Sequence, residues 1–191
     1  MALRFFSRPL LVATLVAAAL ISGCATHSAS NPSNYGQLSK DVKAVDATIE
    51  RESKRALDQA DARLADARIR THSYNGTLLL VGQVPSEELR TKAGNVVQNL
   101  RGVNQVHNEL TIAGNLPATQ RLTDTWITTN VVSTLATNDR IDSSKIKVTT
   151  ENANVYLMGS VSHEESDRIV AATSSSVGGI QRIVKVFEYI D

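Results

Sequence analysis

The side chains of this chain that could support catalysis or metal binding are few and scattered. Its single cysteine, Cys24, cannot form an internal disulfide, and its four histidines have no cysteine or carboxylate at the spacing of a metal site. His163 beside Glu164 and Glu165 could act in acid–base chemistry, but capping of a helix start explains the two acids more simply. No nucleophile elbow, phosphate loop or H-E-x-x-H motif occurs. The sequence therefore predicts no catalysis, metal, cofactor or small-molecule substrate.

Cys24 instead stands where a lipid-attachment cysteine is expected. Two arginines precede an apolar run at residues 10–21, which is shorter than the roughly 20 residues needed to cross a bilayer. Cys24 follows Ser22-Gly23 behind this run, a pattern that resembles a bacterial lipobox. Ala25 takes the place where the inner-membrane sorting rule puts Asp, which favours the periplasmic face of the outer membrane. We expect a signal peptide at residues 1–23 and a lipid anchor on Cys24.

The mature chain has no charge excess that would attract a polyanion. The full sequence has 20 basic and 19 acidic residues, and loss of Arg4 and Arg8 with the signal peptide leaves 18 basic residues against 19 acidic ones. This balance argues against general binding to nucleic acid. Residues 24–43 are small and polar at their start, and we expect them to form a flexible tether with a root-mean-square span of roughly 25 Å.

The rest of the chain consists of two copies of one pattern. Residues 69–84 recur without a gap at residues 146–161, and the same offset places Gly82 on Gly159. Matches at glycines and at apolar positions preserve backbone geometry and core, so they predict a duplicated fold. No histidine is shared between the two copies. This difference argues again against a catalytic role for the histidines.

Each copy reads as helix, strand, strand, helix, strand. In the first, Asp46 opens an amphipathic helix, Asn75-Gly76 forms a hairpin turn that tolerates positive φ, and Ser86 caps a second helix. The second copy repeats these elements from Asp124, with Asn152-Ala153 at the turn. We expect a first module at residues 44–112, a linker at 113–121 and a second module at 122–191.

This pattern resembles the BON domain. The likeness lies in Asp-x-x-Ile at the first helix, in Val-x-Leu-x-Gly-x-Val across the second strand, and in Gly-Val or Gly-Ile before the last strand. Two such modules behind a lipobox are similar to dual BON-domain periplasmic lipoproteins. The resemblance implies an α+β fold, αββαβ in each module, with a small three-stranded mixed sheet covered by two helices. It also implies phospholipid binding without catalysis, and a role in envelope integrity or cell division.

Trp126, the only tryptophan, lies on an uncharged helix face. At 100° per residue, Ile127, Val131 and Leu135 define the buried side of the helix, and Trp126 points about 140° away from it. Indole is stable at the headgroup depth of a bilayer, and hydroxyl and amide neighbours can bond to headgroups. We therefore expect binding to the surface of an anionic phospholipid membrane through Trp126, Thr125, Thr129, Asn130, Ser133 and Ala136.

Three alternatives stay open. Trp126 could instead fill a seam between the modules. The same surface, or a sheet edge, could contact envelope proteins that assemble the envelope or remodel the cell wall, which would make the protein an adaptor. The first helix of module one carries Arg51, Lys54 and Arg55 among acidic residues, a mixture that is more typical of a solvated face held by local pairs than of a lipid site.

Overall fold

The structure, a computed structural model, describes residues 38–191. The predicted signal peptide, the lipid-attachment residue Cys24 and the tether up to residue 37 lie outside the described residues. The described residues, 38–191, belong to one compact unit, which contains both modules.

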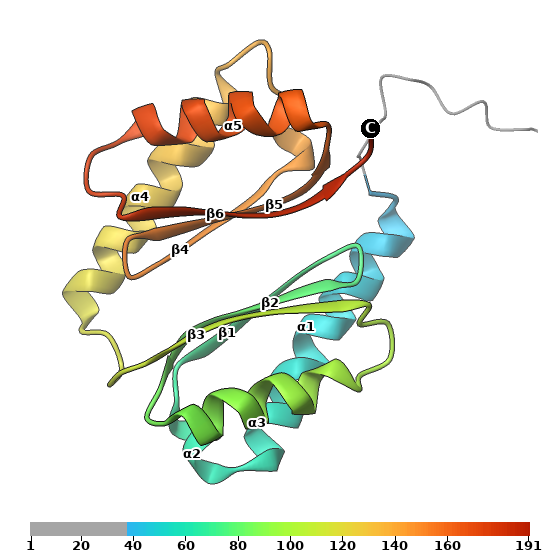
Figure 1. Cartoon of the computed structure of the whole chain (residues 1–191), viewed down its shortest axis with the longest axis vertical. Coiled ribbons are helices and arrows are strands. Elements are labelled where there is room, and N and C mark those ends of the chain that lie inside the picture. The colour runs from blue at the N-terminus through green and yellow to red at the C-terminus, as the bar shows by residue number, and fades with distance from the viewer. Residues whose placement is uncertain (1–37) are drawn as a thin grey trace, which may run out of the picture. The chain divides into compact units, whose positions relative to one another are not determined.

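The two modules follow the same order of helices and strands (Figure 1). The first contains α1 (Lys40–Ala60), α2 (Ala62–Asp66), β1 (Ile69–Tyr74), β2 (Thr77–Val84), α3 (Glu87–Gln98) and β3 (Gln105–Ile112). The second contains α4 (Ala118–Ala136), the 3₁₀ turn η2 (Ser143–Lys145), β4 (Lys147–Glu151), β5 (Asn154–Val161), α5 (His163–Ser176) and β6 (Arg182–Tyr189). Ser86 and Ser162 cap α3 and α5 through their hydroxyls, as the sequence predicts.

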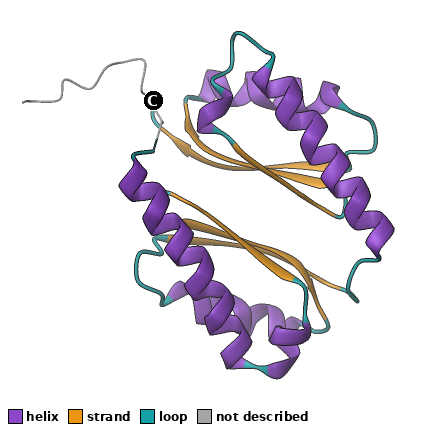
Figure 2. Cartoon of the chain, turned by 180° about the vertical axis from the view of Figure 1, so that it is seen from behind, coloured by secondary structure: helices purple, strands orange, loops and turns teal. Residues whose placement is uncertain are grey.

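Each module contains a three-stranded mixed sheet with its hairpin at one edge. β2 pairs antiparallel with β1 and parallel with β3, and β5 pairs in the same way with β4 and β6. Figure 2 shows the helices on one side of each sheet. The predicted α+β class, with small mixed sheets covered by helices, is confirmed.

The helix starts differ from the predicted ones. α4 begins at Ala118 and not at Asp124, so its first turn lies within the predicted linker at residues 113–121. α1 begins at Lys40, within the predicted tether. The short helix α2 was not predicted; it forms because Asp61 takes an extended conformation that ends α1, and its side chain then caps the next turn.

The aspartates that were predicted to open the helices hold the hairpin turns instead. The carboxylate of Asp124 accepts hydrogen bonds from the backbone N–H groups of Asn152 and Ala153, both at 2.8 Å. Asp46 does the same at the other hairpin, where Asn75 and Gly76 donate at 2.8 and 3.0 Å. Asp46 and Asp124 are buried, and both turns take positive φ. The repeated aspartate therefore ties each leading helix to its hairpin.

The two sheets pack against each other and form an apolar seam. Tyr74, Leu79 and Val81 from module one pack with residues of β5 and β6, namely Tyr156, Met158 and Val186. Their neighbours Leu78 and Leu80 point to the helices of their own module. Since alternate residues of a strand face opposite sides, β2 is buried on both faces. The seam therefore completes the burial of each sheet.

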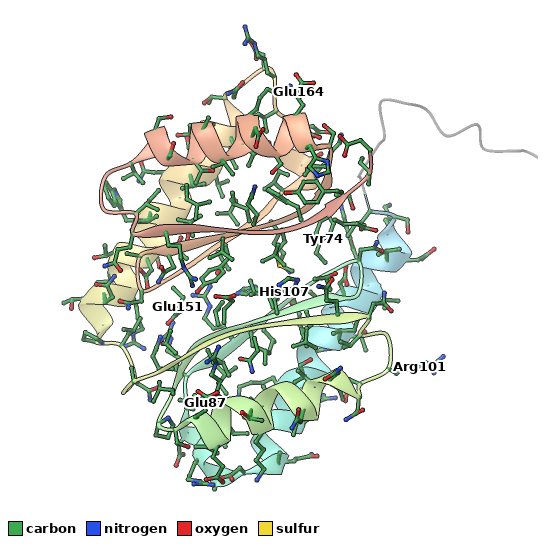
Figure 3. The ribbon with its side chains drawn as sticks, viewed as in Figure 1. Tyr74, Glu87, Arg101, His107, Glu151 and Glu164 are labelled. Carbon is green, nitrogen blue, oxygen red and sulfur yellow. The ribbon has the colours of Figure 1, made fainter. Side chains whose placement is uncertain are left out.

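Charged residues join the modules at the edge of this seam. Arg70 of β1 lies 3.3 Å from the carboxylate of Glu151 and donates to the Thr149 hydroxyl. Gln83 donates to the other oxygen of Glu151 at 2.9 Å. Glu151 is only 4% exposed, and each of its carboxylate oxygens accepts a hydrogen bond from module one. Figure 3 shows Glu151 and Tyr74 between the two sheets.

His72 lies beside this network in its neutral form. Its Nε2 accepts from Arg70 at 3.4 Å, which requires that this nitrogen carries no proton. Burial, together with the positive charges of Arg70 and Lys147, lowers the pKa of His72 from 6.5 to about 4. The surroundings of His72 in the seam therefore favour the uncharged imidazole over the protonated one.

We expect replacement of Asp124 by Ala to lower the free energy of unfolding by about 3 kcal/mol, because two buried turn N–H groups lose a charged acceptor. Asp124→Asn should cost less, since one acceptor oxygen remains. Asp139→Ala, at an exposed position, is the control. Urea denaturation followed by circular dichroism measures the difference, and equal midpoints for Asp124→Ala and the wild type would contradict the assigned role.

His72 should make the fold sensitive to mild acid. Its folded pKa lies below its unfolded value, so its contribution is complete above pH 6.5 and is lost as the pH falls towards 4. From pH 8 to pH 5 this residue alone should lower the free energy of unfolding by about 2 kcal/mol. His72→Gln keeps an acceptor for Arg70 but does not titrate, so its pH dependence should be shallower. Urea midpoints at the two pH values test this, and an unchanged slope in the variant would refute it.

Candidate functional site

The exposed face of α4 carries all six residues predicted to contact a membrane. Trp126 is 55% exposed, whereas Ile127, Val131 and Leu135 on the other side of the helix are buried. The direction of Trp126 was therefore predicted correctly. The apolar seam is formed by other residues, so Trp126 does not fill it. Asn130 is partly buried, and the remaining four residues are exposed: Thr125, Thr129, Ser133 and Ala136.

Leu122 enlarges the apolar part of this face. It is 72% exposed and lies four residues before Trp126, which places both side chains on the same side of the helix. Val132, at 46% exposure, lies at the margin. The sequence analysis missed Leu122 because it started this helix at Asp124. The i, i+4 spacing of leucine and tryptophan was the signal that could have found it.

Three of the polar side chains of the face are hydrogen-bonded to the helix itself. Thr125 and Thr129 each donate their hydroxyl to the carbonyl four residues earlier, at 2.9 Å. Asn130 donates its amide to the carbonyl of Trp126 at 2.8 Å. These donors were predicted to be available to headgroups, but they are engaged within the helix. Since bonded polar groups cost less to remove from water, the face is less polar than its sequence suggests.

Charge is confined to the two ends of α4. Arg121 lies at its first turns, and Asp139 and Arg140 follow its end. Asp124 is 3% exposed and is occupied by the hairpin turn. It therefore presents no negative charge to a ligand at the helix surface.

The corresponding helix of module one has a different surface. Thr48 takes the position of Trp126, and Val45 is the exposed apolar residue nearby, at 52%. The mixed charges of α1 pair locally, as predicted: Lys54 pairs with Asp58, and Arg55 lies 2.7 Å from Glu52. Val45 and Thr48 border a groove of 660 Å³ between α1 and the loop after α3. This groove has no aromatic anchor.

The residues considered for acid–base chemistry have structural partners. His163 stacks on Tyr189 with ring centres 4.0 Å apart, and it contacts Asp191 at 2.7 Å, which lowers the pKa of that carboxyl. Glu164 pairs with Arg168. Figure 3 shows Glu164 on the outer side of its module. Within residues 38–191, no group of three or more His, Cys, Asp or Glu residues is placed to hold a metal ion.

The same described residues include no helix that is long and apolar enough to cross a membrane.

Comparison with known proteins gives one family and several relatives. Residues 45–114 and 123–191 each match the BON domain. The outer membrane lipoprotein DolP of Haemophilus influenzae is 34% identical over 146 residues, which cover 76% of this chain and 75% of that protein. The 21 kDa hemolysin of Actinobacillus pleuropneumoniae is 34% identical over 131 residues, which cover 68% of this chain and 67% of that protein.

Among solved structures, the C-terminal domain of CdsD, named as a structural protein of the Type III secretion system of Chlamydia trachomatis, aligns with a TM-score of 0.31 at 13% identity. The alignment covers 76% of this chain and 67% of that chain. A likeness this loose carries no argument about function.

Proposed function

The chain belongs to the BON-domain family and is an outer membrane lipoprotein with two such domains, and we propose that it binds anionic phospholipid through the exposed face of α4. One observation carries the proposal: Leu122 and Trp126 stand 72% and 55% exposed on a helix face whose nearest charged residue within α4 is Arg121, at the helix start. An indole next to an aliphatic side chain matches the boundary between headgroups and acyl chains.

The lipid anchor and this face would act together. Cys24, once lipidated, would hold the chain at the membrane, and the predicted tether would bring the modules within reach of the headgroups. The face of α4 then adds a second, weaker contact that depends on lipid composition. Such a protein would face the periplasm, gather at regions rich in anionic phospholipid, and support envelope integrity or cell division.

No catalysis is part of this proposal. The histidines and acids discussed above serve caps, stacking and the seam, and neither of the two relatives bears the name of an enzyme. A protein partner at the same face is the competing function. Vesicle binding by the isolated protein separates the two, because it needs no partner.

Trp126→Glu should weaken binding to vesicles that contain phosphatidylglycerol at least tenfold, because an indole that buries about 100 Å² contributes roughly 2.5 kcal/mol. The chain from Ala25 onward suits this test, since it lacks the anchor and keeps the whole compact unit. Co-sedimentation with vesicles measures the affinity. Thr48→Glu places the same charge at the equivalent position of α1 and should have little effect; unchanged binding of Trp126→Glu would overturn the proposal.

The hydroxyls of Thr125 and Thr129 should contribute little to lipid binding, because they already donate hydrogen bonds within α4. Replacing both Thr125 and Thr129 by Val removes two donors that already bond within the helix, so vesicle binding should stay the same or rise. If headgroups instead depend on these hydroxyls, the double variant would bind several-fold more weakly. The same co-sedimentation assay decides, with circular dichroism to show that helix content is kept.

A further inference from the structure

We propose that the start of α4 contains a phosphate-binding pocket, built by arginines from both modules, that receives the headgroup of an anionic lipid. The pocket has a volume of 290 Å³. Arg68 and Arg70 reach it from module one, and Arg121 reaches it from module two. Its remaining lining residues are Ala118, Leu122, Asp124 and Thr125. The proposal rests on the proposed function, because it names the group that the lipid site would recognise.

The pocket keeps unneutralised positive charge. Asp124 is buried and is occupied by Gln120 and the hairpin turn, and Arg70 pairs with Glu151. Among the described residues, no carboxylate oxygen lies within 4.0 Å of a guanidinium nitrogen of Arg68 or Arg121. Two guanidinium groups are therefore available to an anion from solution.

Arg68 has the features of a built position. Its Nε is buried and has no hydrogen-bond partner, which is costly unless an acceptor arrives. The backbone N–H of Arg68 donates to the side chain of Asn115 at 3.0 Å. Its backbone carbonyl packs so closely against Gly82 that a Cβ at position 82 would lie only 2.0 Å from the carbonyl oxygen. Gly82 is thus required for the course of the chain at Arg68.

The N-terminus of α4 adds to the attraction for an anion. α4 is 19 residues long, and Pro117 at its start offers no side-chain cap. The other α-helices of the described part are capped by Ser39, Asp61, Ser86 and Ser162. The free N–H groups at the start of a helix and its dipole favour an anion. Ala118, the first residue of α4, lines the same pocket as the arginines.

The position of the pocket identifies its occupant. Leu122 and Thr125 belong both to the pocket and to the face that carries Trp126. A phosphodiester in the pocket would leave its acyl chains next to Leu122 and Trp126. Guanidinium groups bind phosphate through paired hydrogen bonds, whereas the apolar face alone does not distinguish one headgroup from another. The pocket would therefore supply the preference for anionic lipid.

An NMR titration of the chain from Ala25 onward with dihexanoyl phosphatidylglycerol, below the concentration at which it forms micelles, tests the site without a membrane surface. The Nε–H resonance of Arg68 should shift and saturate. Inorganic phosphate at the same ionic strength should shift it less. A response to inorganic phosphate but not to the lipid would overturn the lipid assignment, and no response to either would overturn the site.

Substitution of single arginines then measures how much each contributes to the affinity for the short-chain lipid. Arg68→Gln and Arg121→Gln should each weaken binding of the short-chain lipid about tenfold, as expected for loss of one charge-assisted hydrogen bond. Arg140→Gln removes the same charge beyond the other end of α4 and should change it less than twofold. Equal losses in all three would mean bulk attraction and refute the pocket. Trp126→Glu should weaken vesicle binding at least tenfold yet leave the Arg68 shift in place, so failure of the membrane proposal and failure of the pocket are seen separately.

Discussion

The packing of the two sheets against each other is the contact on which the rest of the structure depends. A module of about 70 residues is near the lower limit for an independent core. Its central strand is apolar on both sides, and its helices cover only one of them. Burying the second side in a seam stabilises both modules and also places β1 of the first against the second. The lipid site proposed at α4 therefore depends on contacts that neither module makes alone.

Local pattern was sufficient to predict the three strands and the two long helices of each module, but not α2. The Asn75-Gly76 turn, the serine caps of α3 and α5, and the outward direction of Trp126 each depend on residues a few positions apart. Such signals act within one turn or hairpin, so they are visible in the sequence. The repeat gave further support to this assignment, because the same order of helices and strands had to fit both copies.

What the sequence could not reveal depends on residues far apart in the chain. Asp124 looks like a helix start, but its carboxylate bonds to N–H groups 28 and 29 residues later. That error moved the start of α4 and concealed Leu122. The arginines of the pocket come from separate modules, and only the seam brings them together. The bond between Arg70 and Glu151 spans 81 residues and gives no periodic signal.

Duplication and divergence then have distinct physical roles. The repeated aspartate and the glycines at 82 and 159 maintain the backbone. At each glycine a Cβ would crowd a backbone carbonyl just ahead of the first strand of its module, that of Arg68 directly before β1 and that of Lys145 two residues before β4. The leading helices are free to differ because their outer faces bear no part of the core. One exposes paired charges and the other exposes Trp126. Arg68 and Arg70 of the first module line the same pocket as the start of α4, so the proposed headgroup site would need residues from both copies.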